Sequence, residues 1–165
     1  MDQVNKIFDR IDAHITRWMA RYGLILLRVS IGIVFLWFGL LKFFPGLSPA
    51  QDLAMRTTDI LTFGLIPSNA SLVILAAWET IIGVGLLFGF FMRVTLLLLF
   101  IQMLGAMTPL FLFPNEVFTH FPYALTLEGQ YIIKNMVIIS AGLVLGATVR
   151  GGRFVANQKS SPRES

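Results

Sequence analysis

Four long apolar stretches dominate the pattern of hydrophobic and polar positions. They cover residues 23–44, 71–91, 94–113 and 131–149. A helix needs about 20 apolar residues to cross the hydrocarbon core of a bilayer, and each stretch reaches or approaches that length. The remaining chain is too short to bury four such segments, so lipid must cover them. The pattern predicts an all-α membrane protein, a four-helix transmembrane bundle formed by residues 1–150 as a single domain.

Basic residues predict the direction of the four spans. They gather before the first span, in the turn between the second and third, and after the fourth: Lys6, Arg10, Arg17, Arg21, Arg93, Arg150, Arg153, Lys159 and Arg163. The two loops on the opposite side contain a single lysine or arginine, Arg56. Cytoplasmic loops carry an excess of lysine and arginine. We therefore expect a multi-pass protein of the bacterial cytoplasmic (inner) membrane, with the N and C termini in the cytoplasm.

Three segments outside the spans have their own patterns. In residues 4–22, apolar side chains recur at three- and four-residue spacing, which predicts an amphipathic helix in the cytoplasmic interface. In the first outer loop, Ser48 and Gln51 have the spacing of a capping box, and Gly64 can end a helix, so we expect a short helix between them. Residues 151–165 are polar and predict a disordered cytoplasmic tail.

Composition narrows the chemistry. The mean hydropathy is +0.75 and 13% of the residues are charged, about half the share of a soluble domain. The absence of cysteine excludes thiolate nucleophiles, disulfide exchange and Cys-ligated metal centres. His14 and His120 fall on opposite sides of the membrane, so we expect no metal site. The net charge of +4 comes mainly from the two tails. It is explained by the orientation of the protein in the membrane rather than by nucleic-acid binding. No self-contained catalytic constellation is present, which leaves enzymatic activity open.

Ionisable residues within the spans are costly and point to function. They are Arg28, Lys42, Glu79 and Lys134. Glu79 lies about 12 Å inside the outer end of its span, where so short a side chain cannot reach the headgroups. It must be paired, protonated or in contact with water. Lys42 and Lys134 lie near outer ends and either reach towards Glu79 or extend to the headgroups. A purely structural ion pair is the alternative role for Glu79.

Helical spacing predicts how these residues come together. The first, second and fourth spans each carry glycine or alanine on the same face as a polar residue, and we expect these three faces to meet. The third span is mostly leucine and is expected to face lipid. The result would be a ligand pocket in the outer half, with Glu79 as the candidate catalytic residue, lined by Lys42, Glu79, Lys134, Asn135, Trp78 and Tyr131. Arg28 and Gln102 would form an inner-half polar contact.

Short motifs in these spans resemble the DoxX-like family of small four-helix membrane proteins. They are Arg28 with FGLLKF at residues 38–43, the glutamate and glycines Glu79, Gly83 and Gly89, and EGQYIIKN at residues 128–135. The resemblance covers residues 22–149. The group includes a thiosulfate:quinone oxidoreductase subunit and mycobacterial members linked to membrane-associated oxidative-stress complexes. The resemblance therefore implies a redox- or quinone-associated role, carried by Arg28, Lys42, Glu79 and Lys134.

Three functions remain open at this point. The first is a quinone-associated redox component, in which a quinone or another subunit carries the electrons because no haem, flavin or metal motif is recognisable; quinone is the candidate cofactor. The second is a non-catalytic accessory or assembly subunit of a membrane complex. The third is a small proton-coupled transporter that titrates Glu79. The expected partners are the lipid bilayer and either a membrane-complex subunit or a second copy of the chain.

Overall fold

The computed structural model describes residues 2–44, 46–48 and 50–152. Its elements, in chain order, are α1 (Asp2–Leu41), α2 (Gln51–Leu61), α3 (Ser68–Phe88), α4 (Met92–Met107), α5 (Pro109–Leu112), α6 (Pro114–Val117), β1 (Phe118–His120), β2 (Ala124–Leu125) and α7 (Leu127–Thr148). Four helical segments are long and apolar enough to cross a membrane: Phe8–Leu41, Ala70–Phe88, Met92–Leu112 and Leu127–Thr148. The prediction of an all-α protein with four membrane-spanning helices is confirmed.

The third span faces lipid on one side only: Leu97 and Leu104 are exposed, whereas its other side packs inside the bundle, so the prediction that it faces lipid is confirmed only in part. The helix α3 packs against α1 and α4, and α7 packs mainly on α4. Leu99 of α4 is completely buried, and Leu96 and Met103 belong to the same core. The buried side was not predicted because leucine packs equally well against lipid and against another helix. The short turn of residues 89–91 also forces α4 to lie beside α3.

Glycines bring the backbones of α1 and α3 into close contact. A Cβ atom added to Gly83 would lie 2.5 Å from the backbone nitrogen of Leu36, and one added to Gly39 would lie 2.8 Å from the backbone nitrogen of Thr80. Since Gly39 faces Thr80, α1 ends at Leu41 near the middle of α3. The outer half of α3 is covered by α2 instead. Lys42 therefore enters the bundle at mid-depth rather than at the outer surface.

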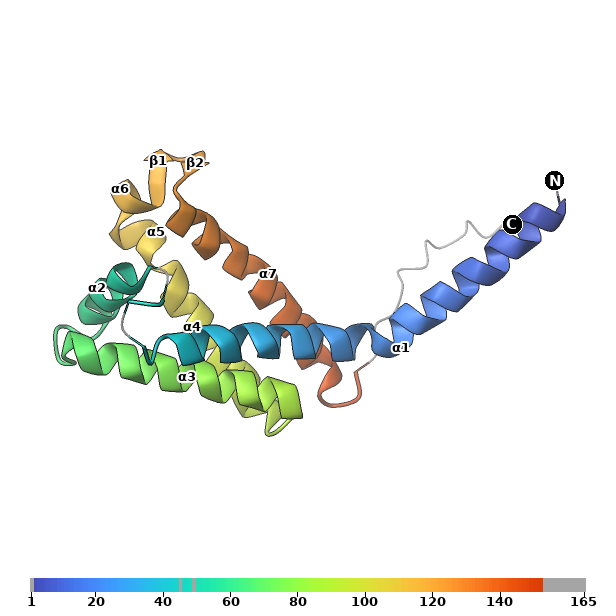
Figure 1. Cartoon of the computed structure of the whole chain (residues 1–165), viewed down its shortest axis with the longest axis horizontal. Coiled ribbons are helices and arrows are strands. Elements are labelled where there is room, and N and C mark those ends of the chain that lie inside the picture. The colour runs from blue at the N-terminus through green and yellow to red at the C-terminus, as the bar shows by residue number, and fades with distance from the viewer. Residues whose placement is uncertain (1, 45, 49, 153–165) are drawn as a thin grey trace, which may run out of the picture.

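The helix α1 is continuous, so the amphipathic segment of residues 4–22 is joined to the first span without a break. Gly23 lies within the helix and does not end it. Figure 1 shows the N-terminal half of α1 extending away from the bundle. Its apolar side chains are exposed, among them Phe8, Ile15 and Trp18. The tail predicted at residues 151–165 lies outside the described residues from 153 onwards.

The helix α2 lies where the first outer loop was expected to form a helix, but the capping box is wrong. The residue before α2 is Ala50, which has a φ of 53° and makes no side-chain cap. Gln51 Oε1 instead accepts a hydrogen bond from the backbone nitrogen of Gly46 at 3.0 Å, closing the loop before the helix. The expected helix end at Gly64 is confirmed: its φ is +72°, and its nitrogen donates to the carbonyl of Asp59 at 2.8 Å.

A small hairpin covers the outer end of α7. The strands β1 and β2 are antiparallel and pair Phe118 with Leu125. Thr126 accepts a hydrogen bond from the nitrogen of Gly129 at 3.1 Å and so caps α7. A Cβ atom on Gly129 would lie 2.2 Å from the carbonyl oxygen of Val117, so the segment before the hairpin rests directly on the start of α7. The elements α2, α5, α6 and the hairpin gather at the end of the bundle opposite the N-terminus (Figure 1).

Candidate functional site

The carboxylate of Glu79 lies between two donors from two other elements. Lys42 Nζ donates to Glu79 Oε2 at 2.6 Å, and Gln102 Nε2 donates to Glu79 Oε1 at 2.9 Å. The side chains of Lys42 and Glu79 are only 14% and 12% exposed. Both carboxylate oxygens are thus hydrogen-bonded, as a charged group in a membrane span requires.

The packing of the helices determines which side chains reach Glu79. Lys42 directly follows α1, whose end is held level with Glu79 by the contact of Gly39 with Thr80. Gln102 reaches the same level because α3 and α4 form an antiparallel hairpin around the turn at residues 89–91. Glu79 and Gln102 lie at similar distances from that turn along their helices, at a rise of 1.5 Å per residue.

The position of Glu79 makes its neutralisation by Lys42 important. Glu79 lies near the middle of α3, roughly 15 Å along the helix from either end. A lone carboxylate at that depth would be protonated or strongly destabilising. The adjacent ammonium compensates its charge, and the Gln102 amide satisfies its second oxygen. The ammonium has three N–H donors, so Lys42 can hold Glu79 and still donate to an acceptor on a ligand.

Two further features lie next to this ion pair. Thr80 Oγ1, beside Glu79 in sequence, is buried and has no hydrogen-bond partner among the described residues. A shallow apolar groove of about 260 Å³ runs along α1 and ends at the residue before Lys42; it is lined by Ile33, Leu36, Trp37, Leu40 and Leu41. Neither Lys42 nor Glu79 lines this groove, so it is an apolar surface of α1 that lies near the ion pair along the chain.

The other residues expected around Glu79 lie elsewhere. Lys134 is exposed, and its Nζ lies 5.4 Å from the centre of the Tyr131 ring. Asn135 is on α7, which packs mainly on α4, and no described hydrogen bond joins it to Glu79. Trp78 Nε1 donates to the carbonyl of Leu98 at 3.1 Å and ties α3 to α4. The expectation that the fourth span meets Glu79 is wrong, because α4 occupies that side of α3.

The expected contact between Arg28 and Gln102 is also wrong. Gln102 donates a hydrogen bond to Glu79 near the middle of α3, whereas Arg28 lies beside Gly89 at the C-terminal end of that helix. The prediction placed Arg28 and Gln102 at the same depth because the depth of each residue was taken from its own span alone. Counting outward from the turn that joins the second and third spans was the available signal, since it sets Gln102 level with Glu79.

Comparison with known proteins places these elements in a family. The family model for DoxX matches residues 23–115, more than half of the chain. The chain belongs to the DoxX family. The matched segment of this DoxX protein contains Lys42, Glu79 and Gln102, the three residues that meet at mid-depth. It does not include α7, the element that supplies Lys134. No curated protein and no solved structure matches the chain.

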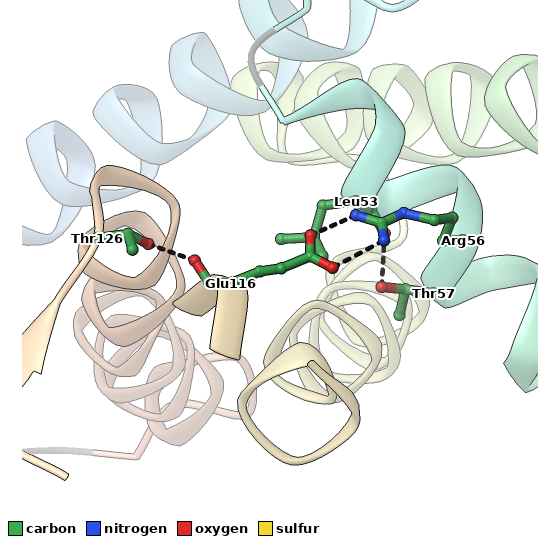
Figure 2. A network of polar contacts seen from close by, with 5 residues as sticks. All are labelled: Leu53, Arg56, Thr57, Glu116 and Thr126. Atoms are coloured by element: carbon green, nitrogen blue, oxygen red, sulfur yellow. Dashed lines mark hydrogen bonds and ion pairs between the residues drawn. The ribbon is translucent and has the colours of Figure 1, made fainter. Parts of the chain in front are cut away.

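The DoxX protein has a second polar region at its outer end, which the sequence analysis did not predict. Figure 2 shows Arg56 of α2 forming a two-pronged ion pair with Glu116 of α6, with Nη1 2.7 Å from Oε1. Thr126 Oγ1 donates to the Glu116 carbonyl at 2.8 Å. The hydrogen bonds from Arg56 lower the pKa of Glu116 below its usual 4.5. This contact joins three segments that are distant in sequence.

A cavity of about 670 Å³ adjoins that ion pair. It is lined by Gly46, Ser48, Ala50, Gln51, Asp52, Leu53, Arg56, Glu116 and Glu128. Its carboxylates outnumber its single guanidinium, so its lining is polar and carries a net negative charge. Among the described residues of this DoxX protein, no three His, Cys, Asp or Glu side chains are arranged to hold a metal ion.

Proposed function

We propose that this DoxX-family protein is a redox-associated membrane component that binds the headgroup of a lipid-soluble quinone beside Lys42 and Glu79. The observation that carries the proposal is the ion pair itself, held with Gln102 at mid-depth; an apolar groove on α1 ends one residue before Lys42. A quinone combines an apolar body with carbonyl acceptors, which matches the donors of Lys42 and the surface of α1. When bound, a quinone supplies the capacity to carry electrons and protons.

Each residue of the site has a separate task in this proposal. Lys42 donates a hydrogen bond to a quinone carbonyl while it remains paired with Glu79. Glu79 keeps the lysine charged and provides a carboxylate that can hold or release a proton. Gln102 orients the carboxylate through its bond to Oε1. Trp37, 65% exposed on the groove, offers an aromatic face for the ring.

A structural role alone explains this arrangement less well. Replacing a buried ion pair by apolar residues of similar size is often neutral or stabilising. A lysine, a glutamate and a glutamine brought together from three elements are therefore a costly way to join helices. In membrane spans, such groups most often mark ligand or proton sites.

The test is mass spectrometry of quinones extracted from gently purified protein. We expect near-stoichiometric quinone in the wild type and a loss of about tenfold or more in Glu79→Gln. Lys134→Gln is the matched control, because it removes a lysine that is exposed, faces the Tyr131 ring and makes no described ion pair with Glu79. Equal quinone in the wild type and Glu79→Gln, or none in either, would contradict the proposal.

An accessory subunit is the second candidate, favoured by the N-terminal half of α1. This segment extends beyond the bundle and exposes an apolar face that includes Ile11, Trp18 and Met19. Such a face binds either the membrane surface or another subunit. The same purification separates the candidates. A partner polypeptide retained by both wild type and Glu79→Gln, without quinone in either, supports the accessory role.

A further inference from the structure

Arg28 carries a charge that the described part of the protein does not pair. The ion pairs of that part are Lys42–Glu79 and Arg56–Glu116, and neither includes Arg28. Its Nε atom is buried and has no hydrogen-bond partner. The side chain is half-buried on α1, within the apolar part of the helix. An arginine in this setting requires an anion or equivalent acceptors.

The guanidinium lies against the C-terminal end of α3. Gly89 ends that helix with a φ of 73°, and a Cβ atom there would lie 2.5 Å from Arg28 Nη1. Glycine thus provides the left-handed turn and also the space for the guanidinium. The helix terminus contributes a partial negative charge of about half a unit, which is less than the full charge of the guanidinium.

No described carboxylate lies near enough to Arg28 to neutralise the rest of its positive charge. On α1 itself the nearest described acidic side chain is Asp12, roughly 24 Å along the helix. Glu79 lies about 15 Å from Gly89 along α3. The remaining described carboxylates outside the N-terminal half of α1 are on α2, α6 and α7 at the outer end of the bundle.

The surroundings of Arg28 resemble a membrane interface. Arg21 lies two turns earlier on the same stripe of α1, and Arg93 lies in the first turn of α4; both are exposed. The exposed aromatic rings of Phe88, Phe90 and Phe91 lie around the same turn. Figure 1 shows α1 continuing past the end of α3, and Arg28 lies beside Gly89 at that end.

We propose that Arg28 binds the phosphate of an acidic phospholipid in the leaflet at this end of the bundle, which the basic residues predict to be cytoplasmic. The guanidinium fork matches two phosphate oxygens and favours a charged partner. Arg21 and Arg93 attract the net negative charge of the lipid. The acyl chains extend along the exposed apolar faces of α1 and α3. This site is separate from the quinone site proposed at Glu79.

The experiment is native mass spectrometry of the full chain released from detergent with added phosphatidylglycerol, phosphatidylcholine or inorganic phosphate. We expect phosphatidylglycerol adducts on the wild type, about tenfold weaker binding by Arg28→Gln and an intermediate loss for Arg28→Lys. Arg17→Gln is the matched control, since Arg17 is exposed on the same helix and bonds to the Ala13 carbonyl at 3.0 Å. Unchanged adducts in Arg28→Gln would overturn the proposal.

Two other outcomes would also overturn it. Equal binding of phosphatidylcholine would remove the preference for an acidic lipid, and displacement of the lipid by millimolar inorganic phosphate would indicate a site for free anions. If Arg28→Gln does not fold, a photoreactive phosphatidylglycerol can be cross-linked to the wild type. We expect cross-links in residues 24–31 and 86–93. Cross-links confined to other segments would contradict the assignment.

Discussion

At the scale of single residues, Glu79 illustrates how a membrane span accommodates a carboxylate. Its two oxygens take donors from Lys42 and Gln102, so three elements share one charge pair. The cost of burying a charge identified Glu79 from the sequence, but it did not show whether Lys42 or Lys134 would pair with it. Gln102 was predicted to contact Arg28 instead of Glu79. A neutral amide in a span indicates a functional site less clearly than a charge does, and the depth of Gln102 depends on the α3–α4 turn.

The coupling within this pair gives a prediction about stability. Glu79→Met leaves the Lys42 ammonium unpaired, and we expect a loss of about 3 kcal/mol or more in the free energy of unfolding. The double variant with Lys42→Met removes both charges and should be more stable than either single variant. Thermal unfolding of all four proteins in one detergent measures this. Losses in the double variant equal to the sum of the two single losses would show that the charges are independent.

At the scale of elements, the glycine faces determine how α1 meets α3. Helical spacing identified Gly32, Gly39 and Gly83 as positions of close approach, and in the structure all three lie between these two helices. The same spacing predicted that the first, second and fourth spans would meet, but α7 packs mainly on α4, because a glycine face fits any smooth partner. It also gave no warning that α1 would continue without a break through residues 4–22, since every residue there tolerates a helix.

The close contact at Gly83 predicts a sensitive position. Gly83→Ala places a methyl group 2.5 Å from the Leu36 nitrogen, so α1 and α3 must separate. We expect a destabilisation of about 1–3 kcal/mol and a weaker Lys42–Glu79 contact. Gly105→Ala is the control within α4, because nothing lies within 4 Å of its added Cβ atom. Thermal unfolding compares the two; equal melting temperatures would refute the packing argument.

At the scale of the whole molecule, the contacts run in series from α1 to α3, α4 and α7, and the outer end is joined by side chains far apart in sequence. Arg56 and Glu116 connect α2 to α6, and Thr126 continues the contact to the start of α7. The carboxylate and the guanidinium that meet here belong to separate loops. Sequence spacing contains no information about such a contact.

This outer ion pair predicts a dependence of stability on pH. The pKa of Glu116 is lower in the folded protein than its usual 4.5, so the pair stabilises above that pH. The stabilisation is lost as the pH falls through the lowered folded value. We expect Glu116→Gln to lower the melting temperature slightly at pH 7, by about 2 °C at most because the pair is exposed, and this difference to shrink as the pH falls through the lowered folded pKa. A difference that does not shrink on acidification, or that 1 M salt leaves unchanged at pH 7, would contradict this.

The length and apolarity of four segments were sufficient to predict the membrane bundle, and the cost of burying charge was sufficient to identify Glu79, with Lys42 or Lys134 as its partner. These features are local, because a bilayer imposes them on each helix separately. The order of packing, the central place of α4, the level of Gln102 and the Arg56–Glu116 contact depend on which surfaces meet. Lipid and leucine are equally apolar, so the hydrophobic pattern cannot distinguish a helix neighbour from the membrane. The close approach of backbones at glycines and the short α3–α4 turn determine which helices become neighbours.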